Sequence, residues 1–173
     1  MIGVLKIYVA LVDPLNRMIG RVVMYGIFIM MGILLWSSIS KTFFMPSLWT
    51  LEMAQFAMVA YYVLGGPYAL QMGDNVRMDL LYGEWSERRK TSIDAVTVLF
   101  LITYLVVLLW GGWDSLMYSF KYGGERSPTA WRPYLWPIKS IMVAGIGLML
   151  LQALSEFFKD LLRLAGEDMG EKT

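Results

Sequence analysis

The sequence predicts an all-α integral membrane protein with four transmembrane helices and short amphipathic helices at the membrane interface. The composition suits a chain surrounded mostly by lipid, with 57% hydrophobic and only 17% charged residues. A helix needs about 20 residues to cross a bilayer core, and the lengths of four stretches without charged residues are close to that number. They are Val22–Ser40, Met53–Gly73, Ala95–Trp113 and Ser140–Ser155. None alternates polar and apolar residues as barrel strands do, which leaves helices as the spanning structure.

The whole chain, residues 1–173, fits a single membrane domain. The fourth stretch is short, but Pro133–Ile138 extends it and Lys139 can carry its ammonium to the headgroups. Before the first span, apolar residues recur at helical spacing and predict an interfacial helix at about 3–13. Asp13 and Pro14 then form a cap and first-turn pair at which a new helix begins. The expected spans are about 19–41, 52–73, 92–114 and 134–156, with a cytoplasmic tail at 157–173.

The chain lacks the residues of most catalytic and metal sites. It contains no cysteine and no histidine, which removes thiolate nucleophiles, imidazole acid–base chemistry and Cys/His metal ligation. We therefore predict no catalytic residues, no cofactor and no metal site, and we do not expect an enzyme. The net charge of +1 gives no electrostatic footprint for a nucleic acid.

Basic residues predict the orientation. The positive-inside rule places both termini and the second connection in the cytoplasm, because ten lysines and arginines lie on that side and five on the other. Arg88, Arg89 and Lys90 would meet the anionic headgroups of the inner leaflet, at about 1 kcal/mol each. Six of the seven tryptophans fall at the outer side, either as an aromatic belt or as a docking surface. The five outer cations are Lys41, Lys121, Arg126, Arg132 and Lys139.

No predicted span carries an ionisable residue near its centre. Buried charges within a bilayer usually mark ion, proton or substrate routes, so the spans hold no sign of a coupled transport pathway of their own. A self-assembling channel or carrier, with its pathway between identical copies, stays open as an alternative. An anchor for a redox complex is a further alternative, although the chain could hold no haem through imidazole and no iron–sulfur cluster.

Small residues offer surfaces for helix packing. Gly65, Ala69 and Gly73 form a ladder at four-residue spacing on the second span, and Gly66 with Pro67 adds a bend. The ladder could pack against a helix of this chain or against another subunit. At the start of the same span, Glu52 could favour the helix dipole, pair with Lys41, or form an ion pair with a cation of the third connection. Those cations are Arg126, Arg132 and Lys139.

An ordered set of residues from Trp49 to the end of the fourth span resembles a known family. The second span and its exit contain Glu52, then Gly65-Gly66-Pro67-Tyr68-Ala69, then Asn75 to Leu81. The later part contains Ser119, Glu125-Arg126-Ser127, Pro133, Trp136-Pro137-Ile138-Lys139 and Leu151-Gln152. Together they resemble the small permease subunit of TRAP transporters, the tripartite ATP-independent periplasmic systems. One departure is Asn75, where many members carry histidine.

The resemblance implies a partner for each step of transport. A large membrane subunit of the TRAP type holds the sodium and substrate sites and moves by an elevator motion, while a periplasmic binding protein delivers an organic acid. The small subunit scaffolds the large one in the bacterial inner membrane, and membrane lipids surround it. The resemblance does not name the substrate. The candidates for subunit contact or docking are Trp49, Glu52, Gly65, Gly66, Ala69, Gly73, Arg77, Asp79, Glu125, Arg126, Ser127, Trp136 and Pro137.

Overall fold

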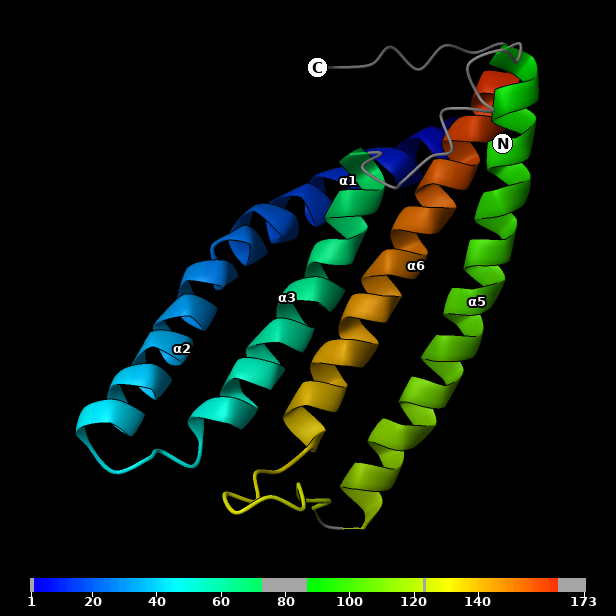
Figure 1. Ribbon diagram of the computed structural model, residues 1–173. Helices are drawn as coiled ribbons and strands as arrows, with labels where there is room; N and C mark the ends of the chain where they lie inside the picture. Colours follow the sequence, from blue (N-terminus) through cyan, green and yellow to red (C-terminus); the bar gives the residue numbers. More distant parts are fainter. Residues whose placement is uncertain (1, 73–86, 123, 165–173) are drawn as a thin grey trace.

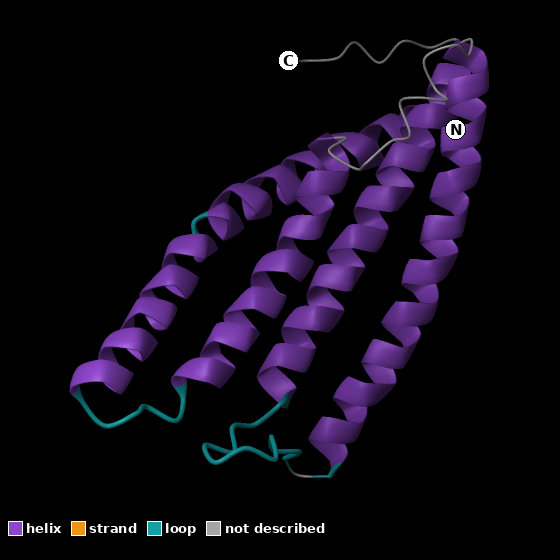
Figure 2. Cartoon of the chain, in the orientation of Figure 1, coloured by secondary structure: helices purple, strands orange, loops and turns teal. Residues whose placement is uncertain are grey.

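The computed structural model describes residues 2–72, 87–122 and 124–164, and within them the chain is all-helical (Figure 2). The described part contains no strand; an isolated bridge between Arg126 and Tyr134 is the β-type pairing in it. The all-α prediction is therefore confirmed. The helices are α1 (Ile2–Met24), α2 (Gly26–Phe43), α3 (Thr50–Met72), α5 (Glu87–Lys121) and α6 (Trp136–Leu164).

The long helices form one layer. Helices α2, α3, α6 and α5 lie side by side in that order, and α1 crosses α3 and α6 at one end of the row (Figure 1). We call this the terminal end, where α1 begins and α6 stops; the opposite loop end carries the connections 44–49 and 122–135. A single layer leaves two open faces, so few apolar side chains are buried. These are Val9, Val12, Ala54, Leu105, Leu116, Ile138, Ala153 and Leu162.

Helix α1 differs from the predicted interfacial helix at 3–13. It runs from Ile2 to Met24 with Pro14 inside it, so no new helix begins at Asp13-Pro14. Asp13 does not cap a helix because its carboxylate contacts α6 instead. The break lies eleven residues after Pro14, at Tyr25. Hydrogen bonds of the 3-10 type run there from Tyr25 N to Val22 O (3.2 Å) and from Phe28 N to Tyr25 O (3.1 Å). The expected first span is thus divided between α1 and α2.

Three segments are long and apolar enough to cross a membrane: Leu5–Phe43, Val96–Lys121 and Trp136–Leu162. The predicted second span corresponds to α3, which has 23 residues and is long enough to cross. Helix α3 is not among the three because Glu52, Gln55 and Gln71, with its tyrosines and glycines, lower its hydropathy. The described part of the chain therefore holds three candidate spans where the sequence predicts four.

Two glycines permit close crossings between helices. A Cβ atom at Gly20 of α1 would lie 2.4 Å from Cβ of Tyr68 on α3. A Cβ atom at Gly145 of α6 would lie 2.5 Å from Cγ1 of Val63 and 3.0 Å from its carbonyl oxygen. Since real Cβ atoms do not approach so closely, both positions require glycine for α1 and α6 to pack on α3.

Candidate functional site

A polar network at the terminal end joins α1 to α6. The carboxylate of Asp13 accepts hydrogen bonds from Ser155 Oγ (2.7 Å) and Gln152 Nε2 (3.2 Å). It also pairs with Lys159 Nζ at 2.6 Å. Asn16, one turn further along α1, donates from Nδ2 to Gln152 Oε1 at 2.8 Å. These bonds connect residues more than 130 positions apart in the chain, so they fix where α1 crosses α6.

The network is deeply buried at its centre. Asn16 is 1% exposed, and Gln152 and Ser155 are fully buried. Lys159 also contacts Glu156 at 2.8 Å on its own helix, so the lysine bridges two carboxylates. Sequence reasoning did not find this network. The signal is present, because Asp13 with Asn16 and Gln152 with Ser155 and Lys159 follow helical spacing on two otherwise apolar helices.

At the loop end, Glu125 is the centre of a second network. Its Oε2 accepts a hydrogen bond from Ser119 Oγ at 2.8 Å and forms an ion pair with Lys139. The hydrogen bond from the Lys139 ammonium, followed by the bond from the Ser119 hydroxyl, lowers the pKa of Glu125 below its usual range. Lys139 thus lies beside a carboxylate of the connection that precedes its helix, instead of reaching outward alone.

Glu52 lies in the first turn of α3, the position at which a carboxylate favours the helix dipole. It is 5% exposed, and its Oε1 accepts a hydrogen bond from Ser127 Oγ at 3.0 Å. Its Oε2 is buried without a hydrogen-bond partner among the described residues. The predicted ion pairs of Glu52 with Lys41, Arg126, Arg132 or Lys139 are not found within the described part of the chain. The third connection does contact Glu52, but through a hydroxyl group instead of a cation.

The same connection folds back on itself as a short hairpin-like turn. Backbone bonds run from Ser127 N to Pro133 O and from Leu135 N to Glu125 O, both 3.0 Å. The guanidinium of Arg126 lies 4.4 Å from the ring centroid of Tyr134. Trp136 and Pro137 begin α6, where the Trp136 ring lies 5.8 Å from Phe120. The predicted residues Glu125, Arg126, Ser127, Trp136 and Pro137 are therefore brought together with Glu52 at the loop end.

The small-residue ladder on α3 is only partly covered. A Cβ atom at Gly65 would meet nothing within 4 Å, and Ala69 is exposed. A Cβ atom at Gly66 would lie 2.1 Å from the terminal methyl of Met149, a flexible contact on α6. Within the described residues, the face with Gly65 and Ala69 is therefore open. The predicted Gly73, Arg77 and Asp79 lie outside the described residues.

The remaining predicted residues lie near the ends of helices. Trp49, 38% exposed, directly precedes α3. Arg88, Arg89 and Lys90 belong to the first turns of α5, which begins at Glu87. Their predicted contact with lipid headgroups stays a prediction.

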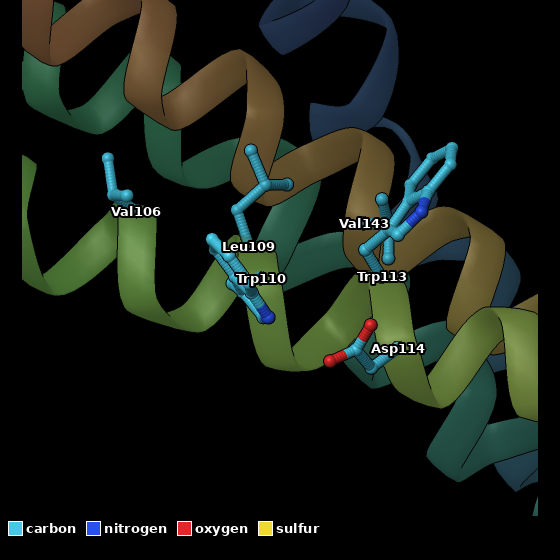
Figure 3. Close-up of a pocket in the computed structure, with 6 residues that line it drawn as sticks. All are labelled: Val106, Leu109, Trp110, Trp113, Asp114 and Val143. Atoms are coloured by element: carbon cyan, nitrogen blue, oxygen red, sulfur yellow. The ribbon is translucent and has the colours of Figure 1, made fainter.

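An apolar pocket of about 560 Å³ lies between α5 and α6. In Figure 3 its residues on α5 follow successive turns of that helix, and Val143 belongs to the neighbouring α6. The lining includes one carboxylate, from Asp114, and it brings no nucleophile, base or group of metal ligands together. Within the described residues no three acidic side chains gather as a metal site would require. The pocket is lined by Val106, Leu109, Trp110, Trp113, Asp114 and Val143.

These features define a helical membrane protein with open apolar faces, whose polar groups mainly hold its own helices and connections together. Residues 14–163 match the family of DctQ components of tripartite ATP-independent periplasmic transporters. The match covers most of the chain, so this protein belongs to that family, the small permease components of TRAP transporters, and the resemblance found in the sequence is confirmed. No curated protein matches the chain.

Proposed function

We propose that this chain scaffolds the large, elevator-type membrane subunit of a TRAP transporter, for sodium-driven uptake of an organic acid delivered by a periplasmic binding protein. The single observation that carries the proposal is the one-layer fold, which leaves apolar side chains exposed on long helices (Figure 1). In a bilayer, helices associate through van der Waals packing and interhelical hydrogen bonds, for which a broad open helix face is suited. A flat row instead presents a wide surface for a second membrane protein.

The membrane arrangement follows from the same proposal. Helix α3 would form the fourth span because it lies in the row between α2 and α6, both of which belong to candidate spans. A covering subunit would shield its polar residues from lipid. The terminal end would face the cytoplasm of a bacterial cell and the loop end the periplasm, as the distribution of lysine and arginine predicts.

The loop end would then be the place of docking for the binding protein. The exposed Arg126 and Arg132 lie on a connection that Ser127 joins to the buried Glu52 of α3. Charged groups fixed in position by hydrogen bonds suit recognition of a polar partner surface. In this proposal the chain has no catalytic role, and the sodium and substrate sites belong to the large subunit.

Affinity purification tests the proposal. The chain, tagged at its C-terminus, is extracted from native membranes in mild detergent, and the proteins that accompany it are identified by mass spectrometry. We expect a polytopic protein in near-equal amount. Recovery of this chain alone would contradict the scaffold role, and ion flux through the purified chain in liposomes would then test the alternative of a self-assembling channel or carrier.

The open ladder on α3 gives a sharper test. In Gly65→Leu the added Cβ atom would have no described atom within 4 Å, so we expect the fold to be retained, while a partner helix seated on α3 would be displaced. We expect less large subunit in the purified complex and slower uptake. Gly32→Leu on α2 is the matched control, since its Cβ position is equally open. Equal recovery from Gly65→Leu and the unmodified chain would remove α3 from the interface without affecting the family assignment.

A further inference from the structure

The connection between α2 and α3 has its apolar side chains on the outside. Consecutive apolar residues from the last turn of α2 onward are largely exposed, and Met45 reaches 91%. Water-facing loops normally present polar groups, because exposed apolar surface costs free energy in water. The exposed fractions are 77% for Phe43, 68% for Phe44, 91% for Met45, 64% for Leu48 and 38% for Trp49.

Three hydroxyl side chains of the same region are buried. Ser37, Ser40 and Thr50 are 5%, 3% and 0% exposed. Ser40 Oγ donates to the carbonyl oxygen of Met45 at 2.8 Å. Thr50 Oγ1 lies 3.1 Å from both Ser37 Oγ and the carbonyl oxygen of Ser47, and accepts a bond from Ser47 Oγ at 3.3 Å. The hydroxyl groups therefore satisfy one another and the backbone of the connection.

Two backbone hydrogen bonds close the helix ends on either side of the connection. Phe44 N donates to Ser40 O and Met53 N donates to Trp49 O, both at 3.0 Å. Pro46 has no N–H group to satisfy. Within the connection, the hydroxyl groups of Ser40 and Thr50 donate to the carbonyl groups of Met45 and Ser47. This arrangement, with hydroxyl groups inside and apolar side chains outside, fits surroundings less polar than water.

The other connection at the loop end provides the contrast. No charged residue lies between Lys41 and Glu52, whereas the α5–α6 connection exposes Arg126 and Arg132. The two connections are therefore suited to different media although they lie at the same end of the row (Figure 1).

Two observations favour lipid over a protein as the medium. Phe43, Phe44 and Met45 are adjacent and all largely exposed, and neighbouring residues project in different directions, whereas a protein partner covers one face. The connection also directly continues the candidate span Leu5–Phe43, whose α2 part exposes Leu34, Leu35 and Ile39. A surface that is apolar on several sides and continuous with a membrane span matches the bilayer.

We propose that residues 43–49 are immersed in the interfacial layer of the leaflet at the loop end and anchor that end of α2 and α3 at a fixed depth. Trp49 lies at the boundary between the lipid headgroups and the acyl chains, where an indole ring can contact both polar and apolar groups. The exposed Lys41 reaches back to the lipid phosphates along its aliphatic stem. The proposal concerns the bilayer alone and does not depend on the identity of the large subunit.

Site-specific spin labels test the depth of the connection, and the absence of cysteine from the chain makes single labels straightforward. Met45→Cys and Thr129→Cys place a label at an exposed position of each connection. The full chain is reconstituted alone in phosphatidylcholine–phosphatidylglycerol vesicles. We expect the label at 45 to show a several-fold higher ratio of oxygen to nickel-chelate collisions than the label at 129. Circular dichroism confirms that both variants keep their helix content.

Equal nickel-chelate access at both positions would overturn the proposal. Access at 45 that falls only when the large subunit is co-reconstituted would also overturn it, and would assign the connection to a protein interface. Since the measurement is made first on the chain alone, failure here leaves the proposed scaffold role to be judged separately by co-purification.

Discussion

The two ends of the helix row hold their polar groups in different ways. At the terminal end, Asn16, Gln152 and Ser155 are almost completely buried and connect helices from opposite ends of the chain. At the loop end, Glu125 bonds to Ser119 and Lys139, which lie within 14 residues of it, and its side chain is 37% exposed. The first network fixes the tertiary arrangement, while the second shapes a surface.

This difference bears on what each end can do. Removing one member of the buried network leaves charged and amide groups without partners in a region with little water. At the loop end, the partly exposed carboxylate of Glu125 can exchange its bonds with water or with a partner at lower cost. A rigid end and an adaptable end suit a subunit that must hold its own shape and also meet other proteins.

The largest effect is expected from Asp13→Ala. It removes one of the two carboxylate partners of Lys159, one of the acceptors for Gln152 and the acceptor for Ser155. Loss of one member of a buried pair costs about 3 kcal/mol. We expect a lower melting temperature of the purified chain in detergent. Spin labels on cysteines placed at Leu11 of α1 and Leu161 of α6 should change from one narrow distance to a broad distribution.

Asp114→Ala is the matched control for this loss. Asp114 is an exposed aspartate of α5 that makes no hydrogen bond among the described residues, so its removal should leave melting and distances unchanged. If Asp13→Ala behaves like Asp114→Ala, the terminal network does not hold α1 in place and the comparison between the two ends fails.

Sequence patterns predicted the parts of this fold that depend on local periodicity. Apolar runs located the long helices, whereas the predicted absence of an ion route through the spans stays a prediction. The residues Glu52, Glu125, Ser127 and Trp136, which the family resemblance singled out, do gather at one end. The open face at Gly65 was one of two alternatives that the ladder left undecided.

Other features required the tertiary structure. Asp13-Pro14 has the local signature of a helix start, but contacts with Ser155 and Lys159, over 140 positions away, keep α1 continuous there. The inverted α2–α3 connection was also hidden, because a sequence does not tell which side of a short loop its serines face. At Asp13 long-range hydrogen bonds outweigh the local preference, whereas the bonds of the connection join residues 3 to 13 positions apart.

A smaller effect is expected from Ser127→Ala, which removes the hydrogen bond of Glu52 to the α5–α6 connection. A bond of this kind to a carboxylate contributes about 1.5 kcal/mol. We expect faster amide hydrogen exchange in residues 124–135 with little change in global melting. Ser115→Ala, on an exposed face of α5, should change neither quantity. A fall in melting as large as that of Asp13→Ala would mean that the loop end is as essential to the fold as the terminal end.

The smallest effect is expected from acid at the loop end. Because the pKa of Glu125 in the fold lies below its ordinary value of 4.5, the ionised carboxylate stabilises the connection above that pH, and the contribution is lost as pH falls through the lowered pKa. At about pH 6 the melting temperature of Glu125→Gln should therefore be lower than that of the unmodified chain, and this difference should disappear towards about pH 3. Asp114→Asn, at an exposed site with no hydrogen bond among the described residues, should show no such closing difference. The difference in melting temperature between Glu125→Gln and the unmodified chain could instead be constant with pH. That result would assign the role of Glu125 to shape and hydrogen bonding instead of charge. The loop end would then resemble the buried terminal network more closely.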